Sequence, residues 1–332
     1  MRSHHAPTKH LLERFTYKDS RARSGRAIWI FEKGRAPRSS RDLGSECAQH
    51  GYFGGADNGE DECDIDARFN QEYELPFNRI LSAIDSNLRI FHSLEIRTIC
   101  ARYVSHLFHR SKARRDGGSQ LLVDLIERYR SIAEDGKKLR AYTAKVSIIA
   151  QRSVSLEEVR NVLLRQSTYY LSEEGKQTMY VNDIDRATKS LASHLTPLQW
   201  SVIRSQGPEG YFISDTPVIS LARDHWGAVS YGQGIGQPTA EWFLPISHSR
   251  VLRIAQRPRL GEVADSAEVN DLNVGQIVTM TDRLYGRNPS KWIDQIVQSH
   301  GAIYKFHSDV FKGDLPLGFE DEFDEVMSQF KL

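Results

Sequence analysis

The hydrophobic positions at the start of the chain predict a short helix. Phe15 follows Leu12 by three residues and Leu11 by four, which places the three side chains on one face of a helix. Pro7 suits the first helical position, where its missing N–H is not needed. We therefore expect a helix that begins at Pro7 and packs one apolar stripe against a core.

The next apolar run predicts a β hairpin. Residues Ala27–Glu32 (AIWIFE) are rich in β-favouring side chains, and Lys33-Gly34 follows them as a turn. Residues 35–40 are expected to form the second arm. Pro37 restricts that arm to the edge of a sheet, because proline cannot donate a ladder hydrogen bond.

Apolar residues at helical spacing then predict a helical middle region. Phe69, Tyr73 and Phe77 lie four residues apart, although Pro76 is expected to kink or end their helix. Clearer stripes cover residues 96–108, 121–132 and 156–164.

Short strands replace the helices from about Trp200. They are expected over Tyr211–Ile213, Pro217–Leu221, Trp242–Ile246 and Val251–Ile254. Residues 269–284 return to helical spacing and run into Tyr285-Gly286. The last residues, 319–332, are acidic and are expected to form a solvated tail.

This order predicts an α+β fold with an N-terminal helix and β hairpin, a helical middle and a β-rich C-terminal third. We expect a single domain over residues 1–318, followed by the acidic tail. Within it we expect the helix plus hairpin over residues 1–60, the helical region over residues 61–198, and the strands plus a helix over residues 199–318.

Charge is strongly segregated, although the net charge of the 332 residues is only +1. Residues 1–42 hold eleven Lys/Arg and four Asp/Glu, and residues 43–74 hold one Arg and nine Asp/Glu. Residues 97–115 hold six basic side chains and no acidic one. This pattern is typical of a polyanion-binding face beside an acidic, metal-binding loop. It also fits oppositely charged segments that lie against each other or face water.

Several classes of protein are disfavoured by the sequence. Cys47, Cys63 and Cys100 form no CxxC pair, so neither a zinc knuckle nor a disulfide framework is indicated. The signatures of P-loop NTPases, zincins and α/β-hydrolases do not occur. No run approaches the roughly 18 apolar residues of a membrane span, so we expect a cytoplasmic protein without a membrane partner.

The pair His4-His5 is the densest chemical signal. At the start of a helix, unpaired N–H groups and the helix dipole favour a neutral imidazole and attract anions. A neutral histidine there suits metal ligation or general base catalysis. Alternatively, the pair caps the helix or packs by hydrogen bonding.

Asp215 lies in a Ser-Asp-Thr-Pro turn after an expected strand. A carboxylate at a strand end is a usual place for a catalytic or metal-binding group. The same turn also forms for structural reasons, because Asp and Ser bond nearby backbone N–H groups.

Arg110 and Glu72 are weaker candidates. Arg110 ends the clean helix and suits bidentate recognition of a phosphate, or it complements the helix dipole. Glu72 follows the acidic loop and would bind a metal, or it is a solvated surface residue.

Together these motifs resemble those of the bacterial domain-of-unknown-function family numbered 4238. Members open with a pattern close to HHxVPxxYLxxF, which is similar to residues 4–15, and continue with a strand that contains a Trp, here Trp29. The Ser-Asp-x-Pro-Val turn matches residues 214–218. Three further family motifs also have counterparts here: a Pro-Leu/Ile-Ser segment is similar to residues 245–247, a Leu-Asn helix to residues 272–273, and a Tyr-Gly pair to residues 285–286. Residues 130–195 match no motif of the family.

The resemblance favours functional roles for the residues in these motifs, but it implies no particular activity. Our first hypothesis is a metal-dependent nuclease or phosphodiesterase, used as a toxin or phage-defence effector, in which His5, Asp215 and Arg110 are catalytic. Mg²⁺ or Mn²⁺ would be bound by His4, His5, Glu72 and Asp215, and nucleic acid or a phosphorylated small molecule by Arg110, Ser214 and Asn273. The second hypothesis is a non-catalytic anion- or nucleotide-binding protein, and the third gives all these residues structural roles.

Overall fold

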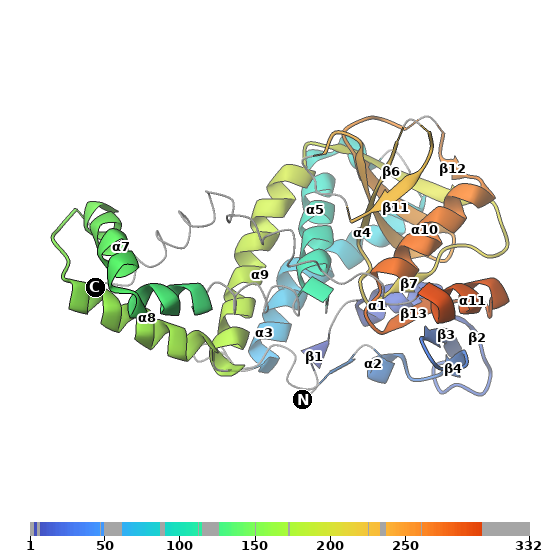
Figure 1. Ribbon diagram of the computed structural model, residues 1–332. Coiled ribbons are helices and arrows are strands. Elements are labelled where there is room, and N and C mark those ends of the chain that lie inside the picture. The colour runs from blue at the N-terminus through green and yellow to red at the C-terminus, as the bar shows by residue number, and fades with distance from the viewer. Residues whose placement is uncertain are drawn as a thin grey trace. The chain divides into compact units, whose positions relative to one another are not determined.

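The computed structural model confirms a mixed α/β fold (Figure 1). It describes residues 3–4, 7–46, 48–49, 62–86, 90–111, 113–114, 126–149, 151–171, 173–224, 226–232, 237–259 and 261–300. The described residues divide into two compact units, one within 1–115 and 182–305 and the other within 116–181. The first unit contains both large sheets and every motif that matched the family.

The N-terminal motif is a strand rather than a helix start. Ser3–His4 forms β1, which pairs antiparallel with β5 (Ala48–Gln49), and His4 lies opposite Ala48. The helix α1 (Lys9–Leu12) begins only after Thr8 and continues as the 3-10 turn η1 (Glu13–Phe15). The expectation that Pro7 opens the helix was therefore wrong. The apolar stripe itself was correct, because its three side chains are buried.

The predicted hairpin forms the centre of a five-stranded sheet. Its arms are β3 (Arg26–Glu32) and β4 (Arg38–Ser40). β3 lies between β2 (Tyr17–Lys18) and β13 (Arg283–Gly286) in the strand order, and β13 pairs with β7 (Ile213–Ser214). The sheet thus joins segments about 250 residues apart in sequence.

The late helix is shorter than its periodicity indicated. Asp265 caps α10 (Ser266–Thr279) by accepting a hydrogen bond from the Glu268 N–H, at 2.9 Å. The helix ends at Thr279, and Leu284 belongs to β13, so the expected helix over 269–284 was wrong at its end. Residues 283–286 form a strand and not a helix because β3 and β7 pair with β13, one on each side. The last helix, α11 (Lys291–His300), follows.

The C-terminal strands form a six-stranded sheet in the order β12-β6-β11-β10-β8-β9. Its strands are β6 (Gln199–Ser205), β8 (Ile219–Arg223), β9 (Val229–Tyr231), β10 (Ala240–Ser247), β11 (Arg250–Ala255) and β12 (Val263–Ala264). The central strands β8, β10 and β11 are almost wholly buried, which explains their continuous apolar runs.

A helical region of the first unit packs with these strands around one hydrophobic core. It includes α4 (Leu75–Ser86), α5 (Leu94–His109) and, from residue 182 onward, α9 (Glu173–Leu195), with the short turns α2 (Leu43–Glu46) and η3 (Ile90–His92). The helix α3 (Glu62–Phe69) also belongs to the first unit. Between α3 and α4 the chain widens into one π-helical turn, Asn70–Glu74. Pro76 does not end the helix, because α4 follows the π-helical turn without a break and continues to Ser86.

The second unit has a small helical core of its own. Residues 126–134, α7 (Gly136–Ile149) and α8 (Leu156–Leu171) are helical. They bury a cluster that includes Tyr129, Leu139 and Leu163. Across the described part of the chain, no helix is both long and apolar enough to traverse a membrane.

Candidate functional site

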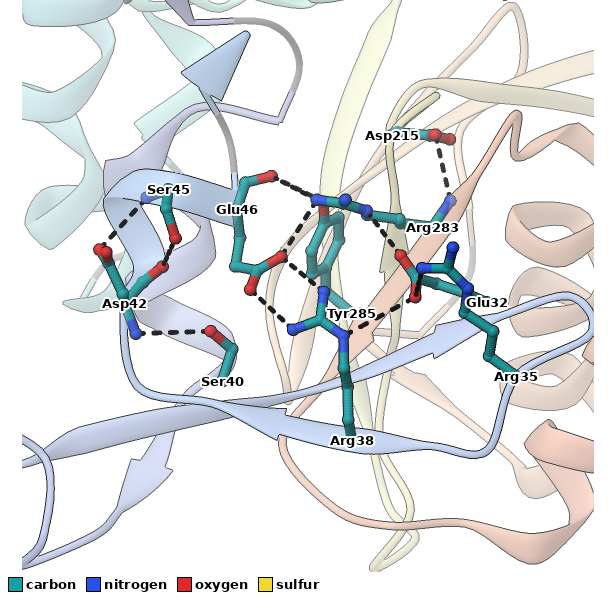
Figure 2. Close-up of polar contacts among 10 residues, drawn as sticks. All are labelled: Glu32, Arg35, Arg38, Ser40, Asp42, Ser45, Glu46, Asp215, Arg283 and Tyr285. Atoms are coloured by element: carbon teal, nitrogen blue, oxygen red, sulfur yellow. Dashed lines mark hydrogen bonds and ion pairs between the residues drawn. The ribbon is translucent and has the colours of Figure 1, made fainter.

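Two glutamates and two arginines form a charged cluster where β3, β4, α2 and β13 meet (Figure 2). This Glu46 cluster consists of Glu32, Arg38, Glu46, Arg283 and Tyr285. The strand register explains why it forms, because Glu32 lies directly opposite Arg283 across the β3–β13 ladder. Arg38 lies opposite Ile30, two residues from Glu32. The sheet itself therefore brings the opposite charges together.

Each carboxylate of the Glu46 cluster holds two guanidinium groups. Arg38 forms a bidentate pair with Glu46, at 2.8 and 2.9 Å, and lies 3.7 Å from Glu32. Arg283 donates to Glu32 at 2.8 Å and to Glu46 at 3.0 Å. The Tyr285 hydroxyl donates to the Glu46 carbonyl oxygen at 3.2 Å. Both arginines are thus fixed in orientation by carboxylates that are themselves buried.

Solvent reaches the arginines but hardly reaches the glutamates. The Arg38 and Arg283 side chains are 42% and 31% exposed, compared with 9% for Glu46. Burial alone would raise the pKa of Glu46, but hydrogen bonds from Arg38 and Ser40 outweigh it and lower that pKa. The hydrogen bond to Glu46 raises the pKa of Arg38. The two arginine side chains are therefore held by buried carboxylates and remain partly open to solvent.

Asp215 supports this cluster through the backbone. Its carboxylate accepts hydrogen bonds from the backbone N–H groups of Thr281, Asp282 and Arg283, at 2.8, 2.7 and 3.1 Å. Its own N–H donates to the Arg283 carbonyl oxygen at 3.0 Å. Burial raises the pKa of Asp215 to about 6, although these backbone hydrogen bonds oppose the shift. Asp215 thus fixes the turn that leads from α10 to Arg283.

Ser214 and Asn273 bond the same backbone region. Asn273 accepts from the Phe212 N–H and donates to the Gly210 carbonyl oxygen, both at 3.0 Å. The Ser214 N–H and hydroxyl both donate to the Gln276 side-chain oxygen, at 2.8 Å. All three side chains are buried. The described contacts of Ser214 and Asn273 therefore fasten β7 and its flanking loops to α10.

A second charged cluster surrounds Arg110, which is fully buried at the end of α5. Arg110 donates to Asp66 at 2.9 Å and to Glu74 at 2.5 Å. Glu74 ends the π-helical turn, a type of distortion that is frequent at functional sites. His106 lies 3.5 Å from Arg110 and is buried, and burial followed by the neighbouring Arg110 charge holds its pKa well below the usual value. His106 is therefore neutral.

The N-terminal strand lies beside both clusters. β1 is in contact with α3, which carries the Arg110 partner Asp66. It also pairs with β5, which begins two residues after Glu46. Farther along the motif, the Thr8 hydroxyl is 3.1 Å from the hydroxyl of Tyr103, which shares α5 with Arg110. Figure 1 accordingly shows β1 between α2 and α3.

The predicted site residues are thus only partly brought together. The described partners of Arg110 lie on α3 and the π-helical turn, whereas those of Asp215 lie in the turn before β13. Glu72 is exposed. His5 and the side chain of His4 lie outside the described residues.

Among the residues the structure describes, no group of three or more His, Cys, Asp or Glu side chains could hold a metal ion. A separate cavity of about 520 Å³ opens where β8, β10 and β11 meet the first turns of α10. Two of its three arginines are engaged in ion pairs: Arg223 with Asp271 at 2.6 Å, and Arg259 with Glu268. This cavity contains none of the predicted site residues.

The sequence profile of the DUF4238 family, described as a protein of unknown function, matches residues 3–296. The chain belongs to this family, and the resemblance drawn from its motifs is confirmed. No curated protein and no solved structure matches the chain. The match includes the segment 130–195, for which no family motif had been found.

Proposed function

We propose that the Glu46 cluster binds the phosphate group of a small anionic ligand. The observation that carries this proposal is the pair of solvent-facing guanidinium groups, Arg38 and Arg283, held by two buried glutamates. Guanidinium groups bind phosphate through parallel N–H···O bonds, and orientation fixed in advance reduces the cost of binding.

The local charge balance also supports an anionic ligand. Arg35, 71% exposed, lies 3.2 Å from Glu32 at the rim of the cluster. Three guanidinium groups therefore face two carboxylates, which leaves one positive charge in excess. A phosphate would accept hydrogen bonds from guanidinium N–H groups that the two glutamates leave available.

Thermal unfolding in the presence of anions tests this proposal. We expect pyrophosphate or ATP to raise Tm, because a ligand at 100 times its Kd stabilises the folded state by about 2.7 kcal/mol. Arg38→Gln should remove most of that increase. Arg41→Gln is the matched control, since Arg41 is 45% exposed and pairs with Asp19 outside the cluster. An equal increase in wild type and Arg38→Gln would refute the assignment.

Metal-dependent hydrolysis of a phosphodiester is a second candidate function. Its supporting observation is the position of β1, which carries His4 beside both charged clusters. In this account His4 or His5 activates water or binds Mg²⁺ or Mn²⁺, and the arginines hold the phosphate. A role in phage defence would follow from activity on nucleic acid.

A cleavage assay decides this second candidate. Wild type and His5→Ala are compared on mixed RNA and DNA substrates with Mg²⁺, Mn²⁺ or EDTA. We expect metal-dependent cleavage that His5→Ala reduces at least 100-fold, the usual scale for loss of an acid–base group. Absence of cleavage in wild type under all conditions would exclude hydrolysis of these substrates and leave ligand binding alone.

A further inference from the structure

The helix α7 of the second unit has one buried face and one cationic face. Leu139 and Thr143 are buried, and Leu139 belongs to the small core of this unit. Four basic side chains are exposed, and the helix contains no acidic residue. These exposed residues are Lys137, Lys138, Arg140 and Lys145.

The cations of α7 are not explained by ion pairing. None of the four has an ion-pair partner among the described residues, and other arginines of the same unit do have one. Arg130 pairs with Glu134 at 3.2 Å, and Arg152 pairs with Glu158 at 2.9 Å. Within the part of the chain that the structure describes, the four basic side chains of α7 are therefore exposed and not neutralised by an ion pair.

Helix stability does not explain these cations either. Lys137 and Lys138 lie in the first turn, where the positive end of the helix dipole disfavours basic side chains. Asp135 caps this end by accepting from both of their backbone N–H groups, at 2.8 and 3.1 Å. These two backbone hydrogen bonds lower the pKa of Asp135, and the charges of Lys138 and Lys137 lower it further. The Asp135 carboxylate therefore offsets part of the positive charge of the first turn, and it does not account for Arg140 and Lys145.

The uncharged residues of the outer face indicate the shape of the partner. At about 100° per residue, Ala141, Ala144 and Ile148 fall within a strip about 60° wide. Lys138 and Lys145 lie on one side of this strip and Arg140 on the other, whereas Lys137 lies in line with the strip at the first turn of the helix. Beyond that first turn, the helix can therefore approach a surface closely along the alanines, while Lys145 and Arg140 reach out to the two sides.

We propose that this face of α7 binds duplex DNA, with the basic side chains on the phosphates of the two strands. An α-helix about 10–12 Å across fits the major groove of B-DNA, which is about 12 Å wide, whereas the major groove of duplex RNA is too narrow. A bilayer fits less well, because among the α7 side chains that the structure describes Ile148 is the one large apolar residue that is exposed, and membrane-surface helices require several.

Fluorescence anisotropy with the full chain and a labelled 20-base-pair DNA duplex tests this inference. The variant Lys138→Gln/Arg140→Gln/Lys145→Gln is compared with a control that loses the same charge at exposed sites elsewhere, Lys18→Gln/Arg165→Gln/Lys291→Gln. A second variant, Ala144→Glu, keeps every cation and places a carboxylate in the uncharged strip. Thermal melting checks that all variants are folded.

We expect wild-type affinity to fall on the order of 100-fold between 50 and 200 mM salt, as four phosphate contacts require. The triple α7 variant should bind at least tenfold more weakly at 50 mM salt. Its plot of log affinity against log salt should be shallower by about 0.9 for each lost cation. Ala144→Glu should also weaken binding, and the control should stay within about threefold of wild type.

Equal binding by wild type and the triple variant would overturn the inference, as would a control variant that loses as much affinity. Tighter binding to single-stranded RNA, or to vesicles containing anionic lipid, would overturn the assignment to duplex DNA.

Discussion

Replacing Arg110 with methionine is expected to lower the free energy of unfolding by about 3–5 kcal/mol. Arg110 is fully buried and holds Asp66 and Glu74. Methionine keeps much of the side-chain volume but leaves the Glu74 carboxylate, only 10% exposed, without its cation. The Asp66 side chain is 27% exposed, so water can solvate its carboxylate and the loss of Arg110 costs less free energy there. Urea unfolding at pH 7 measures the change.

A double variant separates charge from packing at this site. Arg110→Met/Glu74→Gln removes both members of the buried pair, so part of the loss should be recovered relative to Arg110→Met alone. A loss below about 1 kcal/mol in the single variant would contradict the structural role and return Arg110 to the list of ligand-binding candidates. The same variant should leave pyrophosphate binding at the Glu46 cluster unchanged wherever it remains folded.

Replacing Asp215 with alanine is expected to destabilise the chain by about 2–4 kcal/mol at pH 5, because three backbone N–H groups in a partly buried turn lose their shared, buried acceptor. Asp224→Ala is the matched control, since Asp224 also accepts from two backbone N–H groups, at 2.8 Å each, but is exposed.

The effect of Asp215→Ala should also depend on pH. The pKa of Asp215 rises from the ordinary 3.8 to about 6, so the folded state binds the proton more tightly than the unfolded state does. Its contribution to stability is therefore fully present below about pH 4 and declines as pH rises through about 6. We expect a smaller loss of unfolding free energy at pH 7.5 than at pH 5 for Asp215→Ala. A loss that grows with pH would contradict the raised pKa.

Much of the fold could be predicted because its signals are local. The strand Ala27–Glu32, the helix over 96–108 and the paired strands near Trp242 and Val251 all combine strong periodicity with adjacent turn residues. The failures occur where a distant segment decides the outcome. Residues 283–286 read as the end of a helix, yet β3 and β7 pair with them and make them a strand. His4 reads as a helix start, yet Ala48 pairs with it.

The candidate site was harder to predict from the sequence, because residues from distant segments form it. The sequence indicated Asp215 as a strand-end carboxylate, but only the structure shows that the backbone N–H groups of residues 281–283 donate hydrogen bonds to it. The Glu46 cluster was missed, because Glu32 and Arg283 are 251 residues apart and meet only through strand register. One signal was available: Glu32 ends a strand whose preceding residues are almost all apolar, and a buried carboxylate there requires a cation.

Titration calorimetry of wild type and Arg38→Gln with pyrophosphate, at 50 mM salt, tests the central claim most directly. The account predicts one binding site in wild type and at least a tenfold weaker affinity in Arg38→Gln, with Arg41→Gln unchanged. Equal affinity in wild type and Arg38→Gln, or no binding heat in wild type, would show that the Glu46 cluster only holds β13 against α2 and β4.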